Sequence, residues 1–216
     1  MKRRVAILIS GRGSNMAALI RAAAAADFSA EIALVISNRA DADGLKKAAA
    51  SGIATAAIES KPFGNDRPAF EALLQSSLDQ HRIDLICLAG FMRLFTPAFV
   101  QRWYGRMLNI HPSLLPAFAG LEPQAQALRA GVKISGATVH FVIPQTDAGP
   151  ILMQGAVAVR DDDTPEALAA RILEIEHRIY PAALRLLASG QIRFEGGICK
   201  TPGDAAPAVL ISPAVS

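Results

Sequence analysis

Val5-Ala6-Ile7-Leu8-Ile9 is an apolar run, and Ser10-Gly11-Arg12-Gly13-Ser14-Asn15 follows it without a break. A short apolar run of this kind predicts a strand. The glycines that follow predict a tight turn, because glycine lets the backbone bend sharply and approach a ligand closely. Helical spacing sets in after the turn, so the chain begins with a strand, a turn and a helix.

The same alternation continues through the first half of the chain. Apolar runs at residues 32–36 and 53–58 each precede a stretch with helical spacing, and runs at 83–88 and 107–110 extend the series. Strands that alternate with helices predict an α/β fold: a doubly wound, mostly parallel sheet with helices on both faces. Ligands then bind outside the carboxyl ends of the strands. The third helical stretch begins near Pro68, and its apolar face is expected to carry Phe70, Leu73, Leu74, Ser77 and Leu78.

The pattern changes after Gly120. A short helix is expected over residues 123–130, and longer apolar runs cover residues 134–142 and 151–159. The polar, turn-prone segment between these runs contains Asp147 and predicts an antiparallel hairpin with a wide loop.

A long helix is expected in the last third of the chain. Thr164 suits its N-cap and Pro165 its first turn. The helical pattern extends to about Ala188, and Gly190 follows its end. Pro181 lies inside this stretch and should kink the helix.

Composition narrows the class of protein. With 216 residues, 51% hydrophobic and 19% charged, the chain is long enough for one sizeable core. We expect a single domain over residues 1–200 and a poorly ordered tail over residues 201–216, where Pro and Ala are frequent. No apolar run approaches the ~18 residues that span a bilayer, so we expect a soluble, cytoplasmic protein without membrane contact.

The charge and the cysteine content indicate which ligands and which kinds of site the chain can have. The net charge is +3, but the cations are dispersed and aromatic residues make up only 6% of the chain. A nucleic-acid groove needs basic clusters with stacking rings, so an anionic small molecule is the better partner. Cys87 and Cys199 lie too far apart for a metal motif or a disulfide framework, and Cys87 sits in an apolar run where it should pack in the core.

The glycine-rich turn is a candidate anion site. The first amides of a helix and the positive end of its dipole favour an anion such as phosphate, which makes the turn at residues 10–15 a candidate phosphate site. Met16 occupies the third glycine position of a dinucleotide fingerprint, and the lysine of a P-loop is missing. The alternative is a tight turn in which Ser14 or Asn15 caps the helix.

Asn109-Ile110-His111-Pro112-Ser113 places an amide and an imidazole at the end of a predicted strand. Strand side chains at i and i+2 project to the same side, so Asn109 and His111 can both reach one small polar atom. This arrangement is typical of a clamp for an oxyanion or carbonyl oxygen. A buried core histidine without a catalytic role is the alternative for His111.

Asp147 lies on a loop that can reach His111. A carboxylate near an imidazole favours the protonated ring, which then donates as a cation. Local turn chemistry is the alternative for this aspartate. His140 could complete a two-histidine, one-carboxylate metal site with them, but its spacing favours a supporting role, so no metal is expected.

Two arginines and one glutamate are further candidates. Arg93 follows an apolar stretch at residues 89–92, which suits a flat heterocycle with an acidic tail, or else a surface arginine at a helix start. Arg67, before Pro68, is more ambiguous. Glu176 lies midway along the long helix, where it faces either solvent or the pocket.

Six motifs together resemble one family, the phosphoribosylglycinamide formyltransferases, which are folate-dependent enzymes of purine synthesis. The resemblance covers roughly residues 5–192. The motifs occur in the family's order: Ser10-Gly11-x-Gly13-Ser14-Asn15, Ser37-Asn38-Arg39-Ala40-Asp41-Ala42, Leu88-Ala89-Gly90-Phe91-Met92-Arg93, Leu108-Asn109-Ile110-His111-Pro112-Ser113-Leu114-Leu115-Pro116, Asp147-x-Gly149-Pro150 and Glu176-His177-x-Ile179-Tyr180-Pro181.

The resemblance implies a role for each candidate. It implies formyl transfer from the co-substrate 10-formyltetrahydrofolate to glycinamide ribonucleotide, without a metal, by a monomer or homodimer. The implied catalytic residues are Asn109, His111 and Asp147. The implied substrate ligands are Gly13, Ser14 and Asn15 for the phosphate and Glu176 for the glycinamide end. The implied folate site consists of Arg67, Met92, Arg93, Leu94, Phe95 and Asn109, with the pterin beside the loop around Asp147.

One departure and two alternatives remain. Family members usually carry histidines where this chain has Glu122 and Gln124, so the local charge differs. The Asn-Ile-His-Pro-Ser segment also occurs in formyltetrahydrofolate hydrolases, in which water replaces the amine. A non-catalytic nucleotide-binding module would use only the glycine-rich turn.

Overall fold

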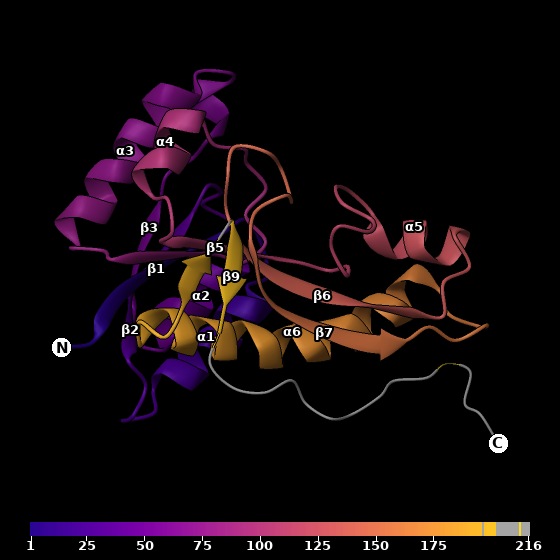
Figure 1. Ribbon diagram of the computed structural model, residues 1–216. Coiled ribbons are helices and arrows are strands. Elements are labelled where there is room, and N and C mark those ends of the chain that lie inside the picture. The colour runs from indigo at the N-terminus through magenta and orange to yellow at the C-terminus, as the bar shows by residue number, and fades with distance from the viewer. Residues whose placement is uncertain (196, 202–211, 213–216) are drawn as a thin grey trace.

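The computed structural model describes residues 1–195, 197–201 and 212. Seven strands form one sheet in the order β3-β2-β1-β4-β5-β6-β7 (Figure 1). They are β1 (Arg3–Ile9), β2 (Ala30–Ser37), β3 (Ala54–Ala57), β4 (Leu85–Leu88), β5 (Met107–His111), β6 (Ile134–Phe141) and β7 (Ile151–Ala158). Strands β1 to β5 pair in parallel, whereas β6 pairs antiparallel with both β5 and β7. The mostly parallel sheet with an antiparallel hairpin is therefore confirmed.

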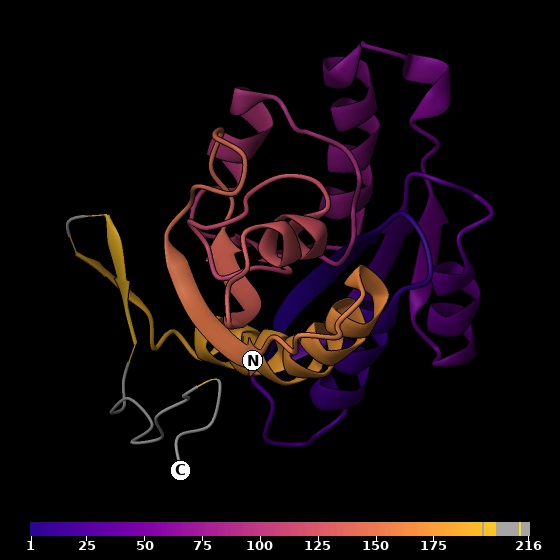
Figure 2. The same ribbon diagram turned by 90° about the vertical axis from the view of Figure 1, so that its right-hand side faces the viewer.

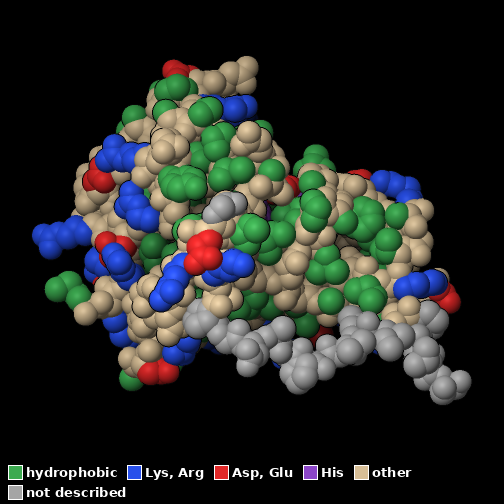
Figure 3. Space-filling view, viewed as in Figure 1, with side chains coloured by type: hydrophobic (Ala, Val, Ile, Leu, Met, Phe, Trp, Pro, Cys, Tyr) green, Lys and Arg blue, Asp and Glu red, His purple; other side chains and the backbone are tan. Residues whose placement is uncertain are grey.

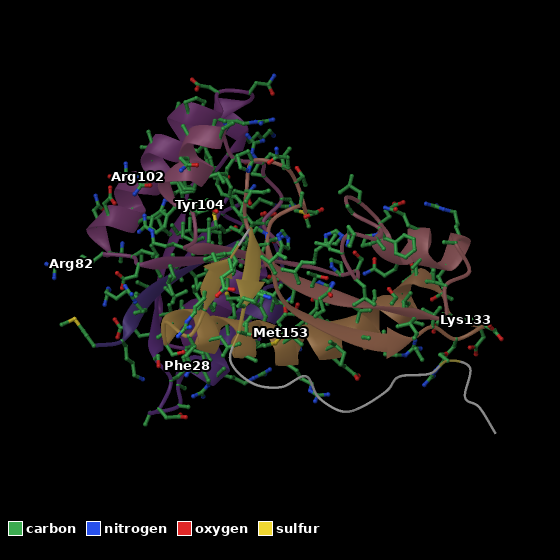
Figure 4. The ribbon with its side chains drawn as sticks, in the orientation of Figure 1. Phe28, Arg82, Arg102, Tyr104, Lys133 and Met153 are labelled. Atoms are coloured by element: carbon green, nitrogen blue, oxygen red, sulfur yellow. The ribbon has the colours of Figure 1, made fainter. Side chains whose placement is uncertain are left out.

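Helices cover both faces of this sheet. In Figures 1 and 2, α1, α2 and α6 lie on one side and α3 and α4 on the other. The remaining elements are α1 (Ser14–Ala23), α2 (Asp43–Ala50), η1 (Lys61–Phe63), α3 (Arg67–Gln80), α4 (Pro97–Arg102), α5 (Pro123–Arg129), α6 (Pro165–Ala188), β8 (Arg193–Glu195) and β9 (Ile198–Lys200). Phe28 and Met153 lie on the α6 side of the molecule, and Arg102 and Tyr104 lie on the α4 side (Figure 4).

The alternation of strand side chains builds a separate core on each face. In β1, Val5, Ile7 and Ile9 pack toward α1 and α6, whereas Ala6 and Leu8 pack toward α3 and α4. Both sets are fully buried, which explains why these strands read as continuous apolar runs.

Helix α6 begins at a capping threonine and is joined to the sheet by one buried tyrosine. The side chain of Thr164 accepts a hydrogen bond from the Ala167 amide, as expected for an N-cap. The Tyr180 hydroxyl donates to the backbone oxygens of Leu88 in β4 and Leu108 in β5. The helix is continuous across Pro181, and the kink stays a prediction.

The structure differs from the sequence predictions in two elements. A two-stranded hairpin, β8–β9, was not predicted, because strands of three residues carry too little alternation to be recognised. In α3, Leu73 is 52% exposed although it was placed on the apolar face. Glu71 is buried there instead, and its carboxylate accepts from the amide and hydroxyl of Thr96. The predicted tail, residues 201–216, lies outside the described residues except for Thr201 and Ser212.

The surface is mixed in character. On the face shown in Figure 3, apolar side chains cover much of the middle, with Lys and Arg toward both sides. Among the helices that the structure describes, none has both the length and the apolarity needed to cross a membrane.

Candidate active site

The sheet carries Asn109 and His111 on one face of β5, at its carboxyl end. Leu108 and Ile110 point the opposite way, into the core with α1 and α6. The neighbouring strand β4 ends beside them, because Leu88 pairs with Asn109 in the parallel register. The alternation therefore brings the two polar side chains to the same side of the sheet.

His140 is the cross-strand partner of Asn109. The two residues pair in the antiparallel register of β5 and β6, and Asn109 Nδ2 lies 3.2 Å from His140 Nε2. His140 Nδ1 lies 3.0 Å from the backbone oxygen of Phe141, which can only accept, so Nδ1 carries the proton. Burial lowers the pKa of His140, and its neutral Nε2 therefore accepts from Asn109.

Asp147 reaches this pair from the wide β6–β7 loop. Its Oδ2 lies 3.5 Å from His111 Nδ1, and its Oδ1 lies 3.8 Å from His140 Nε2. The Gly120 amide donates to Oδ2 at 3.0 Å. Only 9% of the Asp147 side chain is exposed, and its backbone adopts a left-handed φ of 52°. A non-glycine residue in this conformation is uncommon and occurs preferentially at functional sites.

Both ring nitrogens of His111 face acceptors. Nδ1 faces the Asp147 carboxylate, and Nε2 lies 3.0 Å from the backbone oxygen of Phe118. A neutral imidazole can donate through only one nitrogen, whereas the imidazolium donates through both. A neutral His111 can therefore donate to only one of these two acceptors.

Asp147 lies between two histidines, the combination that the sequence offered as an alternative metal site. A histidine binds a metal through a free lone pair on a ring nitrogen. Here the Nε2 lone pair of His140 is directed at Asn109. Within the part of the chain that the structure describes, no group of three His, Cys, Asp or Glu side chains is spaced to hold a metal.

The loop after β5 is held by buried hydrogen bonds. Thr138 Oγ1 donates to the backbone oxygen of Ser113 at 2.7 Å and accepts from the Leu115 amide at 3.0 Å. Gln154 Nε2 donates to the Leu115 oxygen at 2.9 Å. These bonds join β6 and β7 to the loop and so fix the exit from His111.

The glycine-rich turn leads directly into α1. Gly13 is the N-cap, with a left-handed φ of 70°, and Ser14 is the first helical residue. In residues 1–195 no side chain caps this helix, so the alternative in which Ser14 or Asn15 is the cap is wrong. The first amides of α1 are therefore available to an anion.

Asn15 joins this turn to the last helix. Its Nδ2 donates to Glu176 Oε2 at 2.6 Å, and both side chains are buried. Burial raises the pKa of Glu176, and the bond from Asn15 only partly opposes this effect. Asn15 Oδ1 is buried without a partner among the described residues. Glu176 thus faces the turn rather than bulk solvent, which the helical spacing alone did not decide.

The segment after β4 combines exposed apolar side chains with one tethered cation. Met92 and Leu94 are 73% and 58% exposed. Arg93 Nη2 donates to the Gly64 oxygen at 3.0 Å, and the Phe95 ring stacks on Phe91 with 5.4 Å between centroids. Exposed apolar groups beside a cation suit a flat ligand with an anionic end.

This segment and the glycine-rich turn are joined by hydrogen bonds at Ser10, whose amide donates to the Gly90 oxygen at 3.1 Å. Ser10 Oγ accepts from the Met92 amide at 2.8 Å and donates to Asn38 Oδ1 at 2.6 Å. Arg67 begins α3 three residues after Gly64, with an exposed side chain. Cys87, by contrast, is fully buried, and burial raises the pKa of its thiol to about 12, so it remains an unreactive thiol.

Two backbone partners of the site were missed from the sequence. The Gly120 amide and the Phe118 oxygen complete the surroundings of Asp147 and His111. No side-chain pattern could have indicated them. The pairing of His140 with Asn109, in contrast, follows from the register once β5 and β6 are known to be antiparallel neighbours.

Comparison with known proteins gives a consistent set of matches. A family model described as "Formyl transferase" matches residues 3–184. The chain is 39% identical to the phosphoribosylglycinamide formyltransferase of Escherichia coli over 203 residues, which are 94% of this chain and 95% of that protein. It is 49% identical over 200 residues to the human trifunctional purine biosynthetic protein adenosine-3, but it spans only 20% of that relative's length.

Solved structures with related names also superpose closely on this chain. Glycinamide ribonucleotide transformylase 1 from Symbiobacterium toebii superposes with a TM-score of 0.89 at 46% identity, covering 93% of this chain and 94% of that one. A formyltetrahydrofolate deformylase from Pseudomonas syringae superposes at 0.86 with 27% identity, covering 93% of this chain and 66% of that one.

Proposed function

Because the chain belongs to the formyl transferase family, we propose that it transfers the formyl group of 10-formyltetrahydrofolate to the amine of glycinamide ribonucleotide in purine synthesis. The observation that carries the proposal is the meeting of Asn109, His111 and Asp147 at the carboxyl end of β5, with 3.5 Å between carboxylate and imidazole. The match to the Escherichia coli formyltransferase along nearly its whole length supports the same reaction.

The proposed reaction begins with attack of the substrate amine on the formyl carbon. The attack forms a tetrahedral intermediate with a negative oxygen. Its collapse breaks the bond between the formyl carbon and the folate nitrogen, and that nitrogen takes up the proton that the amine loses, which releases tetrahydrofolate. Asn109 and protonated His111 stabilise the oxyanion as donors. His111 Nε2 is held by the Phe118 oxygen in this structure, and we propose that the oxyanion takes over that donor.

Asp147 has two proposed roles. Its carboxylate sustains the charge of His111, and it helps the attacking amine to lose its proton, directly or through a water. Its Oδ2 also accepts from Gly120, which holds the carboxylate toward the ring. The amine is already a competent nucleophile, so the reaction needs no covalent enzyme intermediate.

The two substrates are assigned to the surrounding segments. We propose that Gly13, Ser14 and Asn15 bind the ribonucleotide phosphate and that Glu176 contacts the glycinamide end. The folate is assigned to Arg67, the segment 92–95 and Asn109, with the pterin beside the Asp147 loop. Both substrates are soluble small molecules, and we expect the protein to act on them in the cytoplasm without a metal, as a monomer or homodimer.

Hydrolysis of 10-formyltetrahydrofolate is the second candidate function. The close superposition with the Pseudomonas syringae deformylase favours it, because water in place of the amine would use the same three side chains. A single assay separates the two: tetrahydrofolate release is measured with and without glycinamide ribonucleotide. Release that depends on the ribonucleotide is expected. Equal release in its absence means hydrolysis, and ribonucleotide binding without any release means a non-catalytic binding module.

A further inference from the structure

Helix α2 is seated directly on the glycine-rich turn. The Gly44 amide, in the first turn of α2, donates to the Gly11 oxygen at 3.0 Å. A Cβ at position 44 would lie 2.4 Å from Ile9 Cδ1 and 3.0 Å from the Gly11 oxygen. The absence of a side chain on Gly44 therefore permits this close approach.

Lys47, one turn further along α2, adds a charged contact to the same turn. Its Nζ donates to the backbone oxygen of Arg12 at 2.8 Å. No ion pair within residues 1–195 includes Lys47, whereas its neighbour Lys46 lies 3.9 Å from the Asp43 carboxylate. The ammonium of Lys47 therefore acts on a backbone oxygen rather than on an acidic side chain.

The bonded oxygen belongs to the peptide unit between Arg12 and Gly13. This peptide is trans, so its C=O and its N–H point in opposite directions. An ammonium that binds the oxygen pulls electron density away from the N–H and makes that N–H a stronger donor. It also fixes the orientation of the peptide plane just before α1 begins.

We propose that Lys47 is a positioning residue for the phosphate of glycinamide ribonucleotide, acting through the Arg12–Gly13 peptide rather than by direct contact. The proposal rests on the proposed function, because it takes the glycine-rich turn to be the phosphate site. It also gives a role to α2, which the proposed formyl-transfer site leaves without one.

The test compares Lys47→Met, Lys47→Arg and the matched control Lys46→Met. For each, kcat and KM are measured with glycinamide ribonucleotide and with the corresponding ribonucleoside, which lacks the phosphate. Lys47→Met should raise KM for the ribonucleotide by about two- to five-fold, the range for a charge near a helix N-terminus, with little change in kcat. The ribonucleoside should react as with the parent. Lys47→Arg should restore most of the affinity, and Lys46→Met should match the parent.

Calorimetric titration with the ribonucleotide gives the same comparison without turnover. If Lys47→Met binds the ribonucleotide as tightly as the parent, or weakens both substrates equally, the proposal is wrong. A parent protein that binds the ribonucleotide but transfers no formyl group contradicts the proposed function alone, and the comparison of lysine variants still decides the role of Lys47. A parent that does not bind the ribonucleotide contradicts both.

Discussion

Asn109 carries two hydrogens on its amide nitrogen, and His140 takes one of them. The neutral His140 ring accepts at 3.2 Å, and the second hydrogen of Nδ2 is left for a ligand. The buried histidine thus determines which end of the amide faces the site. His140 therefore orients the Asn109 amide through this hydrogen bond.

Replacing Asn109 by Ala should remove one donor to the proposed oxyanion. Loss of such a donor typically lowers the rate about 10²- to 10³-fold, so kcat should fall by that factor while folate affinity stays within a few-fold. Steady-state kinetics with both substrates checks this. Gln101→Ala, which removes an amide from the exposed side of α4, is the control and should behave as the parent. Near-normal turnover of the Asn109 variant would show that the clamp is assigned to the wrong residue.

Glu176 gives a prediction for the pH dependence of stability. Burial raises the pKa of this carboxyl in the folded state above its value in the unfolded chain. The folded protein therefore holds the proton more tightly, and this contribution to stability is present at acidic pH and lost as the pH rises through the raised pKa. Glu176→Gln cannot ionise, so it should gain stability relative to the parent at neutral pH and lose this advantage near pH 4.

The measurement is the free energy of unfolding in urea at several pH values. Glu174→Gln is the matched control, because Glu174 is exposed on the same helix. Its difference from the parent should not change with pH in the same direction. If the Glu176 variant differs from the parent by the same amount at pH 4 and pH 8, burial does not control this carboxyl.

The residues of the site were predictable where they belong to regular structure. Asn109 and His111 share a strand, so their common side follows from the two-residue period. Asp147 was expected to reach His111, and the structure brings them to 3.5 Å. The bond between Asn15 and Glu176 was not predictable, because it joins residues 161 positions apart and depends on how α1 packs against α6.

At the level of elements, strand prediction succeeded because the sheet is buried on both faces. Parallel strands of this kind are continuous apolar runs, and the first, second, fourth and fifth runs coincide closely with β1, β2, β4 and β5. The buried face of α3 was harder to predict. The helix contacts the sheet through a narrower stripe of side chains than the spacing of its apolar residues suggests. Leu73 therefore lies in solvent, while Phe70, Leu74 and Leu78 are buried.

Arg171 in α6 forms an ion pair with Asp163, before the helix, and a hydrogen bond with the end of β7. Arg171 donates to both carboxylate oxygens of Asp163, at 2.8 and 2.7 Å, and to the Ala158 oxygen at 2.8 Å. The Arg171 guanidinium lowers the pKa of Asp163 to about 2. A two-bond contact of this kind is more specific than an ordinary surface ion pair.

Asp163→Asn should destabilise the protein by about 1–2 kcal/mol at neutral pH, because the variant lacks the carboxylate charge that pairs with Arg171. The folded pKa is depressed, so the contribution is present above the unfolded value of 3.8 and lost as the pH falls toward 2. Urea unfolding at pH 7 and pH 3 checks this, and the gap between variant and parent should narrow at pH 3. Asp161→Asn is the control, because Asp161 pairs with Lys133 but its side chain is 89% exposed. A variant as stable as its parent at pH 7 would show that the clamp adds nothing.

In the whole molecule, the two cores and the candidate site occupy different parts of the sheet. The core with α1 and α6 uses Leu108 and Ile110 of β5, which leaves the opposite face of that strand to Asn109 and His111. The core with α3 and α4 takes Met107, at the beginning of the same strand. The site therefore lies where helix packing ends and strand ends are open, as the doubly wound topology predicts.

The domain boundary expected near residue 200 can be tested by two truncations that differ by the β8–β9 hairpin. The Phe194 ring of this hairpin meets Phe141 edge-on with 4.8 Å between centroids, and Cys199 packs against the core that α1 and α6 help to form. A chain ending after Thr201 keeps these contacts, and its melting temperature should lie within about 1 °C of the parent. A chain ending after Ile192 loses an aromatic pair and buried apolar area, which should lower the melting temperature by about 4–8 °C. Thermal unfolding followed by circular dichroism distinguishes the two. An equal fall for both truncations would place the boundary of the folded domain beyond residue 201, because the hairpin would then depend on residues that follow it.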